Sequence, residues 1–158
     1  MGTRGFISFV ADGEVKTGYK HSDAYPGGLG SDVLDWLRDA DLPAATQDAR
    51  ALRVVAPDSE PTDDDVERLA CFYDPNVGGS SPRPTWYQLL RRTQGSPARI
   101  LAAGAIEDAS GFPADSLFAE WGYVVDFDTQ TFEVYGGFQH GAHVEGRFAS
   151  QTPNDGGY

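Results

Sequence analysis

The two ends of the chain carry the clearest strand patterns. Residues 5–11 (GFISFVA) form a continuous apolar run, which is typical of a strand buried on both faces. Asp12-Gly13 follows directly and favours a tight turn because glycine accepts a positive φ, so residues 14–19 are predicted to return as a second strand. Residues 121–138 alternate apolar and polar positions on either side of Asp128-Thr129-Gln130, which predicts a second hairpin.

The long middle of the chain carries helix signals. Ser31, Thr85 and Ser96 are good N-cap residues, and Thr62 with Asp65 resembles a capping box. The predicted helices run from 32 to 40, from 44 to 55 after Pro43, from 62 to 71, from 86 to Gln94-Gly95, and from Pro97 to Gly104. Strands at both ends with helices between them predict an α+β fold, in which the N-terminal and C-terminal hairpins form an antiparallel sheet with several helices packed on it.

Two segments lack such signals. Residues 74–84 (DPNVGGSSPRP) are rich in proline, glycine and serine and are predicted to be a mobile loop. Residues 139–158 are polar and glycine-rich, which favours a partly flexible tail. With 158 residues, of which 40% are hydrophobic, residues 1–158 are interpreted as a single domain.

The charge of the chain narrows the range of partners. The formal net charge is −12, and residues 32–65 hold ten acidic residues against three arginines. Direct nucleic-acid binding is disfavoured, because affinity for phosphate backbones comes largely from basic side chains. An acidic surface of this kind either keeps a small protein soluble or occupies a basic partner as a decoy.

The sequence indicates a cytoplasmic protein without a membrane segment. Its longest apolar runs, such as residues 98–106, are well short of the ~20 residues that a bilayer-spanning helix needs. No apolar signal region follows the N-terminus, and Phe6 stands where a myristoylation signal has Ser or Thr. The single cysteine, Cys71, excludes an internal disulfide and is interpreted as a buried, inert core residue.

The stretch YKHSDAYPGGLG, residues 19–30, concentrates polar side chains beside a glycine-rich turn. His21, Ser22 and Asp23 do not form a hydrolase triad, because consecutive residues of an extended segment point to opposite faces. Asp23 is either structural, with its carboxylate accepting backbone N–H groups, or functional, as a general base or ligand-orienting acceptor with Tyr25 as the donor.

Two further residues are predicted to lie beside Asp23 and Tyr25. Arg4 begins the first strand near the same edge, where it either pairs with Asp23 or holds an anionic ligand. Trp121 begins the second hairpin. The candidate ligand-binding residues are therefore Arg4, Asp23, Tyr25 and Trp121.

No metal site and no cofactor is predicted. His140 and His143 have the spacing of zinc ligands on a helix, but the glycines around them disfavour a helix and no third ligand is marked. Asp126 and Asp128 resemble the start of a calcium loop, yet Thr131 stands where that loop needs glycine. Outward-facing hairpin acids are the better interpretation.

Four segments carry a resemblance to a known family. They are GTRG at 2–5, D-x-Y-P-x-G-x-G at 23–30, W-Y-x-L-L…Q-G at 86–95, and DSLFAEWGYVVDFD…FEVYGGF at 115–138. Together they resemble a family of small uncharacterised proteins from actinobacteria, bacteriophages and fungi. The resemblance supports the α+β prediction and implies no mechanism. It also implies that Asp23, Tyr25, Pro26 and the glycines are the shared part of the motif, whereas Ser22 and Ala24 are not.

Three hypotheses for function follow. The first is a non-catalytic binding or accessory protein, related to phages or to defence, with a small pocket near Asp23 for a small molecule or a protein partner. The second is a small hydrolase or transferase that uses Asp23 with Tyr25. The third is an acidic decoy for a basic partner. The sequence does not specify a reaction or an oligomeric state.

Overall fold

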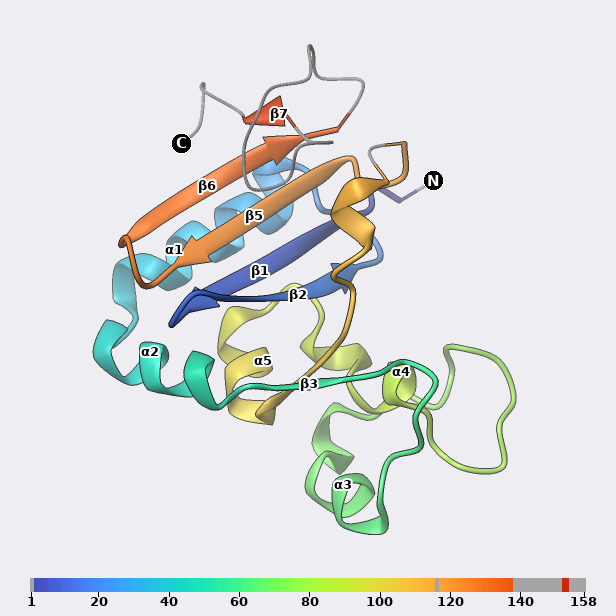
Figure 1. Cartoon of the computed structure of the whole chain (residues 1–158). Helices are drawn as coiled ribbons and strands as arrows, with labels where there is room; N and C mark the ends of the chain where they lie inside the picture. Colours follow the sequence, from blue (N-terminus) through green and yellow to red (C-terminus); the bar gives the residue numbers. More distant parts are fainter. Residues whose placement is uncertain (1, 116, 138–151, 154–158) are drawn as a thin grey trace.

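The largest element of the computed structural model, which describes residues 2–115, 117–137 and 152–153, is a five-stranded sheet. The strands lie in the order β2-β1-β5-β6-β7. They are β1 (Gly5–Ala11), β2 (Glu14–Lys20), β5 (Trp121–Asp126), β6 (Thr131–Gly136) and β7 (Thr152–Pro153). Helices cover one side of this sheet (Figure 1), which confirms the predicted α+β class.

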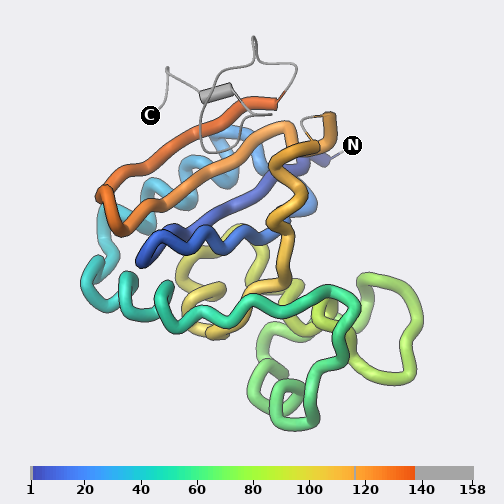
Figure 2. Tube along the Cα trace, viewed as in Figure 1, coloured from blue at the N-terminus to red at the C-terminus, as the bar shows by residue number. Residues whose placement is uncertain are grey.

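Both predicted hairpins are present, and they join through a parallel pair of strands. β1 pairs antiparallel with β2, and β5 with β6. β1 and β5 run in the same direction, with Gly5 opposite Trp121 and Val10 opposite Asp126, and Figure 2 shows them side by side. The sheet is therefore mixed: it is antiparallel within each hairpin, as predicted, and parallel where the two hairpins meet. The long helical connection between the hairpins permits the crossover that a parallel pair requires.

One face of the sheet packs against α1 (Ser31–Asp39), α2 (Leu42–Ala51) and α5 (Pro97–Ala103). Alternate residues of β1 point to this side, because side chains of a strand alternate between faces. The shared core joins strand and helix residues: Ile7, Phe9, Ala11, Val33, Ala45, Ala49, Ile100, Leu101, Tyr123, Val125 and Val134. Helix packing on this face thus explains why every second residue of the first strand is apolar.

The opposite face of β1 is buried as well. Phe6, Val10 and Val124 form a second cluster with Ala119 and with Phe112 of the short helix η4 (Phe112–Ala114). Ser8 and Thr17 lie opposite each other in the β1–β2 hairpin, and their hydroxyl oxygens are 2.6 Å apart. This buried pair satisfies two polar groups that would otherwise be costly to remove from water.

A third cluster lies beside the sheet. The strands β3 (Arg53–Val55) and β4 (Ala105–Glu107) pair in parallel, and α3 (Asp63–Arg68) and α4 (Trp86–Leu89) pack near them. The Asp65 carboxylate accepts a 2.7 Å hydrogen bond from Arg53, whose guanidinium also lies 5.3 Å from the centre of the Trp86 ring. Burial would raise the pKa of Asp65, but hydrogen bonds from Arg53 and Thr62, with the Arg53 charge, lower that pKa to about 2.

Most helix starts agree with the prediction, but three helices end earlier than predicted. α3 and α4 end at Arg68 and Leu89, where the short 3-10 helices η2 (Ala70–Phe72) and η3 (Arg91–Thr93) follow. Thr62 and Thr85 form capping boxes, and Ser96 accepts a hydrogen bond from the backbone N–H of Arg99. The helix predicted over 44–55 ends at Ala51 instead, because residues 53–55 pair with β4. β4 was not predicted, since a three-residue strand is too short to show a pattern.

The predicted N-cap role of Ser31 is also wrong. The residues PGGLG form a short π-helical segment, η1 (Pro26–Gly30), which leads directly into α1. Gly30 already has a helical backbone with φ −58° and ψ −48°, so Ser31 lies inside the helix. Its hydroxyl donates a hydrogen bond to the carbonyl oxygen of Pro26 at 3.2 Å.

Three other predictions concern Cys71, the loop at residues 74–84 and the C-terminal tail. Cys71 is exposed, so the prediction that it is a buried core residue is wrong, because η2 (Ala70–Phe72) places it on the surface. Residues 74–84 contain no helix or strand, and the Gln88 side chain donates hydrogen bonds to the carbonyls of Val77 and Gly79. The mobility of this loop stays a prediction. Apart from 152–153, the predicted tail lies outside the described residues, as do His140 and His143.

Candidate functional site

Arg4 and Trp121 lie at the end of the sheet where β1 and β5 begin. The backbone N–H of Arg4 donates to a Glu120 carboxylate oxygen at 3.0 Å, and its carbonyl accepts from the Glu120 N–H at 3.1 Å. The Arg4 guanidinium lies 5.7 Å from the centre of the Phe118 ring. Trp121 is partly buried against the main core. Arg4 and Trp121 therefore belong to one neighbourhood, as the sequence predicts.

Asp23 and Tyr25 lie at the same end, in a turn held by backbone groups. The Asp23 carbonyl accepts a hydrogen bond from Leu29 N–H at 2.9 Å, and the Tyr25 carbonyl accepts one from Gly28 N–H at 2.9 Å. Between them, the Ala24 carbonyl accepts a 2.7 Å bond from the buried Tyr123 hydroxyl.

The glycine at position 28 permits this closure. A Cβ atom there would lie 2.3 Å from the Asp23 carbonyl oxygen, which is closer than real Cβ contacts allow. Asp23 itself has φ 57°, in the left-handed region where aspartate is tolerated better than most residues. The motif therefore fits a strand-to-helix corner.

The Asp23 side chain plays no visible part in this corner. It is exposed, and among the described residues its carboxylate makes no hydrogen bond. The predicted structural role, in which the carboxylate accepts backbone N–H groups, is therefore not found among the described residues. The Asp23 carbonyl oxygen holds the turn instead. Tyr25 is also exposed, at 45%. None of the four candidate residues lines any of the three cavities identified in the described part of the chain.

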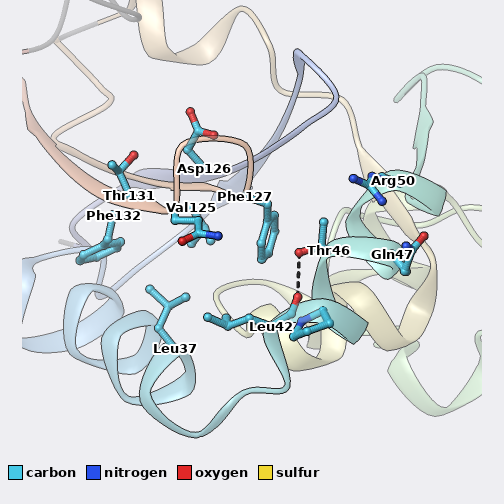
Figure 3. A pocket seen from close by; sticks show the side chains of 12 residues that line it. Leu37, Leu42, Thr46, Gln47, Arg50, Val125, Asp126, Phe127, Thr131 and Phe132 are labelled. Atoms are coloured by element: carbon cyan, nitrogen blue, oxygen red, sulfur yellow. Dashed lines mark hydrogen bonds between the residues drawn. The ribbon is translucent and has the colours of Figure 1, made fainter.

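The main cavity lies at the opposite end of the sheet. It has a volume of about 520 Å³ and opens between the corner that joins α1 to α2 and the β5–β6 hairpin (Figure 3). This volume is within the range of small-molecule sites, which are usually concave and mostly apolar. The residues that line it are Leu37, Leu42, Pro43, Thr46, Gln47, Arg50, Val125, Asp126, Phe127, Gln130, Thr131 and Phe132.

Two aromatic rings form the hairpin side of the cavity. Phe127 stacks on Phe9 of β1, with ring centres 6.4 Å apart and planes at 11°. Phe132 stacks on Tyr123, with ring centres 6.2 Å apart and planes at 10°. Each ring is held on one side by a core ring, so these walls are fixed by the packing of the sheet.

The hairpin turn is stabilised by two carboxylates. Asp126 accepts hydrogen bonds from the backbone N–H groups of Asp128 and Thr129, at 2.9 and 3.0 Å. Asp128 in turn accepts from the backbone N–H groups of Asp12 and Gly13, at 2.9 and 2.8 Å. The turns of both hairpins are thereby tied together beside the cavity. These bonds account for the two acids that resemble a calcium loop in the sequence. The prediction that both acids face outward is wrong for Asp126, which is buried.

The helical wall is fixed at both ends of α2. Asp41 caps the start of the helix by accepting from the Ala44 N–H at 3.1 Å. At the other end, the buried Lys16 ammonium donates to the carbonyls of Ala49 and Arg50, at 2.9 and 3.0 Å. A cation at this end of a helix also interacts favourably with the helix dipole.

Arg50 supplies the only basic side chain among the residues that line the cavity. Its Nε atom lies 3.1 Å from Asp12 Oδ2, and both side chains are substantially exposed, at 41% and 65%. An exposed ion pair of this kind contributes about 0–1 kcal/mol to stability, so it is easily exchanged. Figure 3 shows Arg50 and Gln47 at one end of the cavity and Phe132 and Leu37 at the other.

The chemistry of the lining fits binding better than catalysis. No serine, cysteine, histidine or lysine belongs to the set of residues that line the cavity. The Thr46 hydroxyl donates to the Leu42 carbonyl at 2.7 Å, and the Thr131 hydroxyl is 2.8 Å from that of Thr129. The lining therefore offers no nucleophile with an adjacent base.

A second cavity collects groups with shifted pKa values. It has about 30 Å³ and is lined in part by Tyr19, Tyr87 and Glu107, enough for about one or two water molecules. Burial raises the pKa of Tyr19 and of Glu107. Lys20 does not line this cavity, and burial, followed by the charge of Arg91, lowers its pKa. Shifted values of this kind often accompany function, but this space is too small for a substrate.

Comparison with known proteins gives no further guide. No family model matches the chain, and neither a curated protein nor a solved structure is significantly similar to it. The resemblance to the family described above stays a prediction. Helices capable of crossing a membrane are not found within the described residues.

Proposed function

We propose that the protein binds a small, largely apolar molecule in the cavity between the α1–α2 corner and the β5–β6 hairpin. The observation that carries this proposal is a 520 Å³ cavity whose lining surface is mostly apolar, although half of its twelve lining residues are polar or charged. The proposal keeps the binding hypothesis drawn from the sequence and moves its site from Asp23 to the other end of the sheet.

The other two hypotheses have less support. A hydrolase or transferase at Asp23 needs a pocket there, and both Asp23 and Tyr25 are exposed side chains on a closed backbone turn. A decoy needs its acids on one face. The acids of residues 32–41 lie on and after α1, whereas those of residues 58–64 lie before and in α3, and Figure 1 shows these helices in different parts of the molecule.

Binding of a neutral fluorescent probe tests the proposal. N-Phenyl-1-naphthylamine is apolar, uncharged and small enough for the cavity. We expect the folded protein to bind it, with backbone amide NMR shifts concentrated in α2 and the β5–β6 turn. Leu42→Glu places a charge on the cavity wall and should weaken binding about tenfold or more, since burying a leucine-sized apolar surface is worth about 1.5–3 kcal/mol.

The matched control is Val54→Glu. Val54 and Leu42 are both 43% exposed, and Val54 lies on β3, outside the cavity. The control should bind the probe like the unaltered protein. Absence of probe binding by the unaltered protein, or equal losses in the two variants, would contradict the proposed function.

A further inference from the structure

The charged groups that line the cavity determine which charge its ligand can carry. Arg50 and Asp126 are the only ionisable residues that line it. Asp126 is 3% exposed, and its Oδ1 atom accepts two turn amides. Arg50 is therefore the group in the lining that meets a charge on a ligand, and a guanidinium selects an anion.

The Arg50 side chain has donors available for such an anion. Within the described residues, its ion pair with Asp12 is made through Nε, and no hydrogen bond is made by its two Nη groups. A guanidinium presents its N–H groups in a planar fork that matches the two oxygens of a carboxylate. The backbone of Arg50 is fixed by the Lys16 ammonium, which donates to its carbonyl, so the fork projects from a held helix end.

Asp12 opposes an anionic ligand at this position. Its carboxylate lies 3.1 Å from Nε, and its backbone N–H is bound by Asp128, so the turn holds this acid beside Arg50. Asp12 competes for the guanidinium and repels a second carboxylate. The formal charge of −12 on the chain adds to this repulsion, which makes Arg50 necessary for binding an anion.

We propose that the ligand of this cavity is an amphipathic monocarboxylate, whose apolar body lies between Leu37, Leu42, Phe127 and Phe132 and whose carboxylate binds the Nη groups of Arg50. This inference rests on the proposed function, since it assigns a chemical class to the ligand of the same cavity.

The experiment compares 4-phenylbutyrate with 4-phenylbutanol, which share the same apolar body. Each displaces N-phenyl-1-naphthylamine from the protein at pH 7.5, and the ratio of their dissociation constants is measured. We expect the carboxylate to bind about tenfold more tightly than the alcohol, as hydrogen bonds to charged groups commonly produce. Raising the salt concentration from 50 to 500 mM should reduce this ratio, because an exposed ion pair is screened.

Three variants locate the effect. Arg50→Gln should bring the ratio to about one. Arg38→Gln is the matched control, because Arg38 also pairs with an acid, Asp35, at 3.3 Å but lies outside the cavity, and it should keep the ratio of the unaltered protein. Asp12→Asn should increase the ratio about threefold, because it removes the competing charge. Asparagine suits the φ of 53° at this turn, so the variant keeps the hairpin.

The outcomes separate the two proposals. If neither compound displaces the probe because the probe itself does not bind, the proposed function fails. The present inference is wrong if both compounds bind with equal affinity, because the cavity then does not select for a charged ligand. It is also wrong if the preference for the carboxylate persists in Arg50→Gln, because Arg50 is then not its cause. An Arg50→Gln variant that does not fold would leave the Asp12→Asn ratio and the salt dependence to decide.

Discussion

The two ends of the large sheet differ in how closely their segments pack. Because β1 and β5 are parallel, both begin beside Asp23, Arg4 and Trp121, and both end beside the cavity. At the first end, backbone groups approach so closely that only a glycine fits at position 28. At the second end, side chains from α2 and the hairpin stay apart and leave an open apolar space. The glycine-rich segment PGGLG thus marks the closed end, whereas no glycine lines the cavity at the open end.

Adding a side chain at position 28, at the first end, should have the largest effect on stability. In Gly28→Ala the new Cβ meets the Asp23 carbonyl oxygen, a backbone atom that cannot move independently. We expect a loss of about 2–3 kcal/mol in the free energy of unfolding, measured with urea. Gly27→Ala is the control, since the nearest atom to its Cβ is 3.8 Å away in the Tyr25 side chain, and it should change stability by less than about 0.5–1 kcal/mol. Equal effects in the two variants would show that the corner is not closed by this contact.

Glu107, which lies at neither end of the large sheet, predicts how the stability of the protein depends on pH. One carboxylate oxygen of Glu107 is buried and, among the described residues, has no hydrogen-bond partner. Burial raises the pKa of Glu107 in the folded state. The folded protein therefore keeps this proton where the unfolded chain has lost it, and stability falls as pH rises from the ordinary glutamate pKa through the raised one.

Glu107→Gln removes that loss. We expect the variant to be more stable than the unaltered protein at pH 7.5 and to show a smaller gain near pH 4, where the glutamate is largely protonated in both states. Urea unfolding at the two pH values measures this difference. A variant that is destabilised at pH 7.5 would mean that the buried carboxylate has a partner that the glutamine cannot replace.

The smallest effect is expected at Asp23, the residue that the sequence favours most. Asp23→Asn keeps a side chain that tolerates φ 57° and should change the free energy of unfolding by less than about 0.5 kcal/mol, without altering probe binding. Asp23→Ala should lose about 1 kcal/mol, because alanine is strained in this region of φ. If instead the asparagine variant loses more than the alanine variant, the carboxylate itself is needed, and the functional interpretation of this residue regains support.

Much of the fold could be predicted because its signals are local. The Asp12-Gly13 turn, the capping boxes at Thr62 and Thr85, and the αL glycine at position 104 are each specified by a few neighbouring residues. The strands β3 and β4 are stable only as a pair, so neither shows a pattern alone. Likewise, the parallel junction of β1 with β5 depends on packing between distant segments.

The cavity could not be predicted for the same reason. Its walls come from two separate segments, residues 37–50 and 125–132, and become a site only when the sheet brings them together. One signal was available: Phe127 and Phe132 flank the tip of a hairpin, and in the structure both are only partly buried against the core. The sequence favours Asp23 because a polar residue beside glycines resembles a functional site. Here the glycine at position 28 instead allows close contact between backbone groups.

We expect the parallel junction to form late in folding, because β1 and β5 are far apart in the chain. The β1–β2 hairpin is local and forms on a timescale of about 1–10 μs, whereas β1 receives its central partner only after the whole helical middle of the chain has been made. Contacts between such distant segments slow folding, commonly to milliseconds or longer. During synthesis, Ile7 and Phe9 therefore stay without their β5 neighbours until late. We expect a nascent chain that stops before Trp121 to aggregate, and release of the second hairpin to be the step that commits the chain to its native state.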